Sequence, residues 1–442
     1  MNKEELELLT VSRIQEIAKE MGIGSVSTFN KEQLVIAVLN RQEEIKEKRD
    51  RLTNGDSDPP PKRDLPPSPE KRILKGLVDL NDRNSFVRVE MWLPDKKDLF
   101  LPQGVRQRFS LRTGDLVEVS TLPPREGKRE KFSAVREVLS INGEKPDIQA
   151  LRNRPIFEKL TPIYPNQRVN LETTPLKVTS RILDIIAPIG LGQRAMVVSP
   201  PKAGKTTILK DIADSIAVNH PEIVLMALLI DERPEEVTDF QRSIQGEVIA
   251  STFDEKPENH TRVAEAVSER AKRIAESGKD VVILLDSITR LARAYNLTVN
   301  SSGRTLSGGL DPASLYKPKR FFGSARKIEG GGSLTIVATA LVDTGSKLDD
   351  IIYEEFKGTG NMEVHLDRGL ANRRLFPAID VNGSSTRHEE LLFTDSELPK
   401  VWRLRRILAP LDGPGALELL LHGINGAKTN DEFLNSPELA RG

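Results

Sequence analysis

Near the middle of the chain lies the stretch Ser199-Pro200-Pro201-Lys202-Ala203-Gly204-Lys205-Thr206. It follows a short apolar run at 195–198 and precedes a segment with apolar residues at helical spacing. A strand, a glycine-containing loop and a helix in this order predict a phosphate-binding loop, because backbone N–H groups and the helix dipole attract an anion. Lys205 is then placed to reach the β- and γ-phosphates of ATP, and the Thr206 hydroxyl to bind Mg²⁺. Ser199 stands where the usual pattern has glycine, so a lysine in an ordinary strand–helix turn is the alternative.

The composition of the chain bounds its class. Its 442 residues predict about three domains. The chain has no cysteine, which excludes disulfides and thiolate metal sites, and no apolar run near the ~20 residues of a membrane helix. We therefore expect a cytoplasmic protein without a membrane contact. Lys+Arg and Asp+Glu each number 65, so any nucleic-acid site must be a local patch.

Changes of composition predict four segments. Residues 1–47 read as a small helical domain, with one helix capped by Thr10 and ended at Gly22, and a second capped by Asn30. Residues 48–70 are rich in proline and nearly free of apolar side chains, which predicts a disordered linker. The other two segments are 71–145 and 146–442.

Segment 71–145 is predicted to be all β. Its short apolar runs are separated by turn residues, which favours a small barrel of the OB or cold-shock kind. A barrel with only a structural role is the alternative. The expected strands include 73–74, 86–89, 99–101, 116–119 and 132–135.

In segment 146–442, apolar runs alternate with helical patterns, which predicts an α/β domain with a parallel sheet covered on both faces. Ligands of open α/β sheets bind beyond the carboxyl ends of the strands, so the residues that follow each strand are the candidates for chemistry. The expected strands are 196–198, 224–230, 248–250, 281–285 and 334–340.

Charged residues follow two of these strands. Glu232 and Arg233 come after 224–230, where a carboxylate can activate a water and an arginine can bind nucleotide. Asp286 ends a run of five apolar residues, the pattern of a strand that presents a carboxylate to Mg²⁺. A solvated turn and a helix cap are the respective alternatives. Arg374 or Arg387 can stabilise transition-state charge, although a lone surface arginine is usually solvated.

Two loops combine glycine with positive charge, 301–309 and 343–347. Mobile basic loops on an ATPase core can grip a nucleic-acid backbone, and plain connecting loops are the alternative.

Four stretches resemble the Rho family of bacterial transcription termination factors. They are Pro200-Pro201-Lys202-Ala203-Gly204-Lys205-Thr206, Leu229-Ile230-Asp231-Glu232-Arg233-Pro234-Glu235-Glu236-Val237, Leu285-Asp286-Ser287-Ile288-Thr289-Arg290-Leu291-Ala292-Arg293-Ala294-Tyr295 and Asp343-Thr344-Gly345-Ser346-Lys347. The resemblance is strong over about 150–430 and weaker over 1–145. It implies a RecA-like ATPase domain in a homohexameric ring, a helicase of the 5'–3' RNA–DNA type that binds single-stranded nascent RNA and hydrolyses ATP to move toward RNA polymerase.

The resemblance also implies roles for single residues. Glu232 would be the catalytic base, Asp286 the Mg²⁺ carboxylate, and Arg387 an arginine finger from the neighbouring subunit, while Phe376 would stack on adenine. Arg304 and Lys347 would contact RNA in the central channel. The implied ATP-binding residues are Gly190, Leu191, Gly192, Gln193, Arg194, Ala195, Lys202, Ala203, Gly204, Lys205, Thr206, Thr207 and Arg233.

The barrel departs from the family pattern. The family carries a Gly-Phe-Gly-Phe-like motif for base stacking, whereas this chain has Arg83-Asn84-Ser85-Phe86-Val87-Arg88. We expect Phe86, Phe100 and Phe132 to supply stacking faces. A charge-led contact with RNA phosphates is expected from Arg88, Arg125, Lys128, Arg129 and Lys131.

Two other functions are compatible with the same core. One is a ring-forming P-loop ATPase like RecA or an ATP synthase subunit, with a different role. The other is an ATP-dependent RNA-binding ring without helicase activity.

Overall fold

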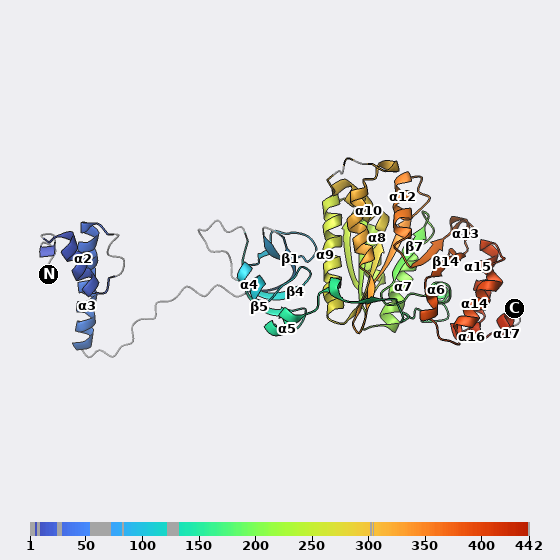
Figure 1. The fold of residues 1–442 in the computed structure, drawn as a ribbon, viewed down its shortest axis with the longest axis horizontal. Helices are drawn as coiled ribbons and strands as arrows, with labels where there is room; N and C mark the ends of the chain where they lie inside the picture. The colour runs from blue at the N-terminus through green and yellow to red at the C-terminus, as the bar shows by residue number, and fades with distance from the viewer. Residues whose placement is uncertain are drawn as a thin grey trace. The chain divides into compact units, whose positions relative to one another are not determined.

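The computed structural model describes residues 5–6, 9–23, 29–53, 72–81, 84–121, 132–300, 303 and 305–440. The chain divides into two compact units, 1–68 and 69–442. Figure 1 shows the helices and strands of both units. The predicted linker falls largely on residues 54–71, which lie outside the described part.

The first unit is a helix pair, as predicted. Helix α2 (Val11–Glu20) and helix α3 (Lys31–Thr53) enclose a small apolar core that includes Ile14 and Leu34. Asn30 caps α3: its side-chain Oδ1 accepts the Gln33 N–H at 2.9 Å, and its own N–H donates to the Gln33 side chain at 3.1 Å. Thr10 precedes α2, but its hydroxyl makes no cap hydrogen bond. Helix α3 continues past the predicted boundary at 47, because residues 43–51 are mostly Glu, Lys and Arg, which favour helix.

The second unit begins with a five-stranded antiparallel barrel. Strands β1 (Arg72–Leu80), β2 (Ser85–Arg88), β3 (Leu99–Phe100), β4 (Leu116–Thr121) and β5 (Val135–Ile141) follow the order β3-β2-β1-β4-β5. Phe100 bridges Ala134 and so joins the two edge strands, which closes the barrel. The fifth strand was predicted too early, at 132–135. It starts at Val135. The side chains of β5 that lie in the barrel core are Val135, Val138 and Ile141.

The rest of this unit is a seven-strand path with the order β14-β13-β7-β12-β10-β8-β9. The strands are β7 (Arg194–Ser199), β8 (Val224–Glu232), β9 (Glu247–Thr252), β10 (Asp280–Asp286), β12 (Ser333–Leu341), β13 (Met362–Leu366) and β14 (Ile379–Thr386). All pair in parallel except β14, which runs antiparallel at one edge. A short ribbon, β6 (Pro162–Ile163) and β11 (Arg326–Ile328), pairs beside β12.

Helices cover both faces of this sheet, as the sequence predicts (Figure 1). Ala195 and Val197 of β7 face one apolar core, and Met196 and Val198 face the other. The first core contains residues of α6 (Val178–Ile186), α7 (Lys205–Asn219), α8 (Pro234–Ser243), α14 (Leu398–Leu408) and α15 (Gly413–Asn425); the second contains α9 (Pro257–Glu276), α10 (Ile288–Thr298), α11 (Tyr316–Gly323) and α12 (Lys347–Lys357). Because both faces are buried, the strands are almost continuously apolar.

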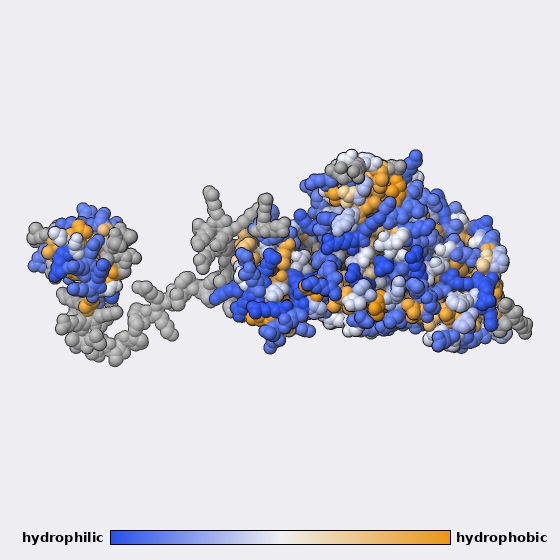
Figure 2. All heavy atoms as spheres, viewed as in Figure 1, coloured by the Kyte–Doolittle hydropathy of each residue, from blue (hydrophilic) through white to orange (hydrophobic). Residues whose placement is uncertain are grey.

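On the face seen in Figure 2, hydrophilic side chains predominate and smaller groups of apolar side chains lie among them. Among the described helices, none has the length and apolar character that crossing a membrane requires.

Candidate nucleotide-binding site

The loop between β7 and α7 has the form of a phosphate-binding loop. Gly204 adopts a φ of 97°, the left-handed region that favours glycine, and α7 begins at the next residue, Lys205. No atom lies within 4 Å of a Cβ added at Gly204, so the backbone angle and not crowding requires glycine. The predicted residues Lys202, Ala203, Thr206 and Thr207 all lie in this loop or the first turn of α7.

Lys205 lies between two buried carboxylates. Its Nζ is 2.7 and 2.6 Å from the two Asp286 oxygens and 3.3 Å from Glu232 Oε2. Burial lowers the pKa of Lys205, but the charges of Asp286 and Glu232 outweigh it, so the pKa is raised above its usual 10.5. The lysine is therefore a fixed cation at the mouth of the loop.

Glu232 reaches this position through a bulge. Asp231 has a φ of 56°, and the pairing of β8 with β9 skips a residue between Ile230 and Glu232. The bulge aims Glu232 at Lys205, and only 3% of its side chain is exposed. Arg290 Nη2 lies 3.4 Å from Glu232 Oε1 and its Nη1 donates to the Asp231 carbonyl.

Asp286 ends β10, as the sequence predicts. Its Oδ1 accepts a hydrogen bond from the Thr339 hydroxyl at 2.8 Å, and its Oδ2 lies 3.5 Å from Thr206 Oγ1. Mg²⁺ in nucleotide sites takes one or two protein oxygens and completes its shell with water and phosphate. A buried carboxylate beside a threonine hydroxyl fits this donor set.

Arg233 and Phe376 lie at the carboxyl ends of the parallel strands, as the phosphate-binding loop does. Arg233 is exposed and directly follows β8. Phe376 precedes β14, whose first residue, Ile379, pairs with Leu366 at the carboxyl end of β13. The Phe376 ring is 51% exposed, so it can stack on a base. Arg374, the alternative charge-stabilising residue, is exposed in the same turn.

Arg387 lies at the opposite end of the strands, beside the amino end of β7. It follows Thr386, which pairs with Met362, which in turn pairs with Ala195 at the beginning of β7. The length of β7 therefore separates Arg387 from the loop, roughly 17 Å. Arg387 is exposed. The structure does not bring it to the Lys205 of its own chain.

The other predicted ATP-binding set, Gly190, Leu191, Gly192, Gln193, Arg194 and Ala195, also lies at the beginning of β7, away from the loop of the same chain. These residues form a packed turn. A Cβ on Gly192 would lie 2.1 Å from the Lys327 nitrogen, and Gln193 Nε2 donates to the Asn361 carbonyl at 3.1 Å. Arg194 Nε donates to the Thr359 carbonyl at 2.8 Å. Burial and then the charges of Arg326 and Arg387 lower the pKa of Arg194.

Sequence reasoning missed two members of the site, Thr339 and Arg290. Thr339 is one of two buried hydroxyls, with Thr335, within the otherwise apolar run 334–340, and these interruptions were a signal. Arg290 stands one turn after Asp286 on α10, within a quoted stretch, but no spacing rule directs it to Glu232.

The two glycine-containing basic loops are in contact. A Cβ on Gly308 would lie 2.8 Å from the Leu348 nitrogen. Lys347 is exposed at the start of α12, and the loop before it is held by the Thr344 hydroxyl, which donates to Asp349 at 2.6 Å. Arg304 lies outside the described residues.

Three phenylalanines for which a stacking role is expected, Phe86, Phe100 and Phe132, lie together on the barrel. The ring of Phe86 lies 6.3 Å from that of Phe100 and 5.3 Å from that of Phe132, both edge-on. Phe100 is 39% exposed. We call these three residues the aromatic cluster.

The Arg88 guanidinium lies 4.9 Å above the Phe86 ring and pairs with Asp79 at 2.5 Å and Asp98 at 2.7 Å. Its side chain is only 11% exposed, so Arg88 holds the ring in place more than it offers a free charge. The remaining cations of the charge-led hypothesis, Arg125, Lys128, Arg129 and Lys131, and also Arg83, lie outside the described residues.

A parallel sheet that brings a loop lysine and two buried carboxylates together at the carboxyl ends of its strands defines a RecA-like P-loop nucleotide-binding domain. In this unit it is joined to a small antiparallel barrel.

The comparisons with known proteins identify the family. Residues 179–386 match the model of the ATP synthase alpha/beta family nucleotide-binding domain, 74–147 match the Rho termination factor RNA-binding domain, and 5–46 match the Rho termination factor N-terminal domain. Transcription termination factor Rho of Bacillus subtilis is 47% identical over 97% of this chain and 94% of its own length. The chain belongs to the Rho transcription termination factor family.

Other relatives are longer. The Rho protein of Streptomyces lividans is 55% identical over 82% of this chain, but the chain spans only about half, 51%, of that relative's length. Among solved structures, an ATPase from the type III secretion system of pathogenic bacteria aligns with a TM-score of 0.52 and 20% identity, over 64% of this chain and 86% of its own. That likeness concerns the fold alone.

Proposed function

We propose that this chain is a transcription termination factor that works as an RNA-dependent ATPase. It binds single-stranded RNA of a nascent transcript, moves along it by hydrolysing ATP as a 5'–3' RNA–DNA helicase, and releases the transcript from RNA polymerase in the cytoplasm. The observation that carries the proposal is the joint position of Lys205, Glu232 and Asp286 at the phosphate loop, in a unit that also carries the aromatic cluster.

Each residue of the site has a part in the reaction. Lys205 and the loop N–H groups bind the phosphates, and Glu232 accepts a proton from the attacking water. Asp286 and Thr206 would hold Mg²⁺, which neutralises charge on the β- and γ-phosphates when bound. Arg233 contacts the nucleotide and Phe376 stacks on adenine.

The position of Arg387 supports a homohexameric ring. Because Arg387 lies a strand length away from its own loop, it can act as an arginine finger only on the nucleotide of a neighbouring subunit. Arg194, at the same edge, would lie beside that interface. Lys347 and Arg304, on the paired loops, would contact RNA in the channel.

The RNA-binding part of the proposal is tested with the full chain and a labelled cytosine-rich oligonucleotide. Phe86→Ala removes one stacking face, worth about 1–3 kcal/mol per base, so RNA affinity should fall roughly tenfold. Tyr164→Ala, an exposed aromatic outside the barrel, is the control. Equal RNA affinity of Phe86→Ala and the wild type would refute the assignment of the cluster.

A further inference from the structure

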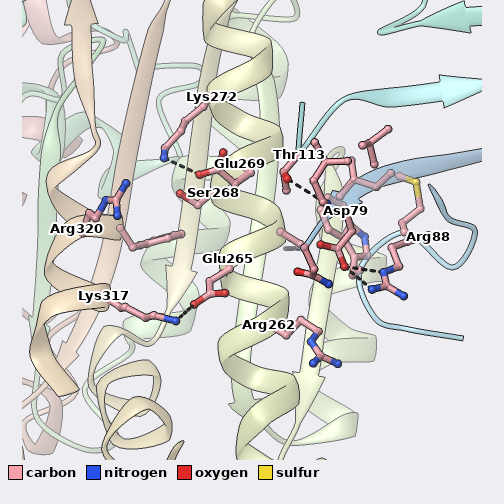
Figure 3. A pocket seen from close by; sticks show the side chains of 18 of the residues that line it. Asp79, Arg88, Thr113, Arg262, Glu265, Ser268, Glu269, Lys272, Lys317 and Arg320 are labelled. Atoms are coloured by element: carbon pink, nitrogen blue, oxygen red, sulfur yellow. Dashed lines mark hydrogen bonds and ion pairs between the residues drawn. The ribbon is translucent and has the colours of Figure 1, made fainter. Parts of the chain in front are cut away.

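A cavity of about 420 Å³ lies where the barrel meets the nucleotide-binding domain. Figure 3 shows its walls: Asp79, Arg88 and Thr113 belong to the barrel, Arg262 and Glu265 to α9, and Lys317 and Arg320 to α11. The volume is in the range of pockets that bind small molecules. The proposed site residues other than Arg88 do not line this cavity.

Each carboxylate that lines the cavity is paired with a cation, and two lining arginines remain beyond these pairs. Glu265 pairs with Lys317 at 2.7 Å, and Glu269 with Lys272 at 2.7 Å. Asp79 pairs with Arg88. The carboxylates of the lining are thus each matched by a cation.

Arg262 and Arg320 are different. Both are exposed, and within the part of the chain that the structure describes neither guanidinium has an ion-pair or hydrogen-bond partner. Arginine presents a planar fork of donors that matches a phosphate group. The other charged side chains of the cavity are neutralised by ion pairs. The guanidinium groups of Arg262 and Arg320 therefore favour the binding of an anionic ligand.

Aromatic side chains form another part of the wall. Trp92, from the barrel, is partly buried against the core of the nucleotide-binding domain and still lines the cavity. Tyr295 of α10 lines it as well, and its hydroxyl donates to Glu265 at 3.2 Å. Tyr295 is only 3% exposed, so Trp92 is the aromatic face that a base can reach. An aromatic face beside free arginines is a combination by which proteins bind single-stranded nucleic acid.

Arg88 is shared by the cavity and the aromatic cluster. This one side chain lines the cavity and also lies over the Phe86 ring. A base stacked on Phe86 would therefore lie next to Arg88, which borders the cavity. On the α9 face, Arg262 and Lys272 are ten residues apart, which is about 15 Å along a helix.

We propose that this cavity is a second RNA subsite, which takes the nucleotides next to those held by the aromatic cluster and guides the strand across α9 toward the nucleotide-binding domain. Arg262 and Arg320 bind its phosphates, and Trp92 stacks on a base. This inference rests on the proposed RNA-binding function and extends it to a surface shared by both domains.

Fluorescence gives one test. The chain has two tryptophans, and Trp402→Phe leaves Trp92 as the sole indole. An oligocytidylate of about ten nucleotides, within the span bound by one OB fold, should quench Trp92 fluorescence. A cytidine dinucleotide, which fills only the aromatic cluster, should not. Unchanged fluorescence at saturating long RNA would overturn the proposal.

The salt dependence of binding gives the second test. For single strands the slope of log K against log salt is about −0.7 per phosphate contact, so Arg262→Ala with Arg320→Ala should make it shallower by about 1.4 for the long oligonucleotide. Affinity for the long RNA at low salt should fall about tenfold, and dinucleotide affinity should not change. Arg152→Ala, an exposed arginine that does not line the cavity, is the matched control.

The outcomes separate the two proposals. If the double variant keeps the wild-type slope and affinity for the long RNA, the cavity is not an RNA subsite, whereas the proposed function stands. If the wild type binds neither RNA at low salt, the proposed function fails, and the subsite fails with it.

Discussion

At the scale of single residues, the proposed hydrolysis of ATP depends on the ion pairs that Lys205 forms with Asp286 and Glu232. Its ammonium group neutralises Asp286 and approaches Glu232. A phosphate in the loop would compete for the same ammonium group, and Asp286 would then be available to hold a metal ion and Glu232 to accept a proton from water. Glu236, one turn further on α8, has a raised pKa because it is partly buried and close to Glu232. The site therefore concentrates negative charge that only cations offset.

The variant Glu232→Gln tests the assignment of the base. It keeps the size of the side chain and one acceptor oxygen but cannot accept a proton, so ATP binding should change little while turnover falls by roughly 10²–10⁴. Nucleotide affinity and the hydrolysis rate are both measured. Glu235→Gln, an exposed carboxylate in the same helix, should hydrolyse ATP normally. Near wild-type turnover in Glu232→Gln would show that another group activates the water.

Asp184 predicts a pH dependence of stability. It is almost fully buried in α6, and burial raises its pKa from 3.8 to about 7, although it accepts backbone hydrogen bonds from Leu171 and Glu172. Because the folded chain binds this proton more tightly, the group's contribution to stability is complete below pH 3.8 and is lost as pH rises toward 7. Urea unfolding of the wild type should show declining stability between about pH 4 and 7. Asp184→Asn should flatten this decline; an equally steep decline in the variant would exclude Asp184 as its cause.

At the scale of elements, the RNA contact proposed for the nucleotide-binding domain depends on the start of α12. Lys347 is the first residue of this helix, exposed, next to the loop that contains Gly308. The proposed contact of Lys347 with RNA belongs to the loop pair and not to the barrel.

Lys347→Ala should therefore lower the stimulation of hydrolysis by RNA severalfold and leave RNA capture by the barrel nearly unchanged. Lys357→Ala, at the other end of α12, should leave both quantities as they are. Hydrolysis and RNA affinity are measured on the same preparations. Full RNA stimulation in Lys347→Ala would remove this residue from the channel.

The elements that could be predicted from the sequence are those with a strong local signal. The five buried strands of the parallel sheet could be predicted from their apolar runs. The start of α3 could be predicted from Asn30, which caps this helix. Strands β13 and β14 were missed, because their inward residues alternate with polar ones and β14 contains Gly383. The shift of β5 depends on which of several valines face the barrel core, and this is set by pairing with β4.

For the site, residues at strand ends could be predicted, because the rule for open sheets directs attention there. The roles of Arg290 and Thr339 could not, since they depend on contacts between elements far apart in the sequence. The pairing of Arg88 with Asp79 and Asp98 likewise appears only once β1, β2 and the segment before β3 are assembled.

At the scale of the whole molecule, the separation of Lys205 and Arg387 has consequences for assembly. Rings mixed from Arg387→Ala and Lys205→Ala subunits contain some interfaces at which an intact lysine faces an intact arginine. Such rings should recover part of the hydrolysis that each variant alone has lost, where loss of the finger costs about 10³–10⁵ in rate. Hydrolysis is measured across mixing ratios, with native mass spectrometry to verify mixed rings. No recovery at any ratio would contradict action across the interface.

The central claim is that RNA binding and ATP hydrolysis are coupled in one chain. The most direct measurement is the steady-state rate of ATP hydrolysis by the full chain with Mg²⁺, with and without saturating pyrimidine-rich RNA. We expect a low rate without RNA and a steep rise with it, absent in Lys205→Ala. A rate that is the same with and without RNA, in a protein shown to bind that RNA, would contradict the account.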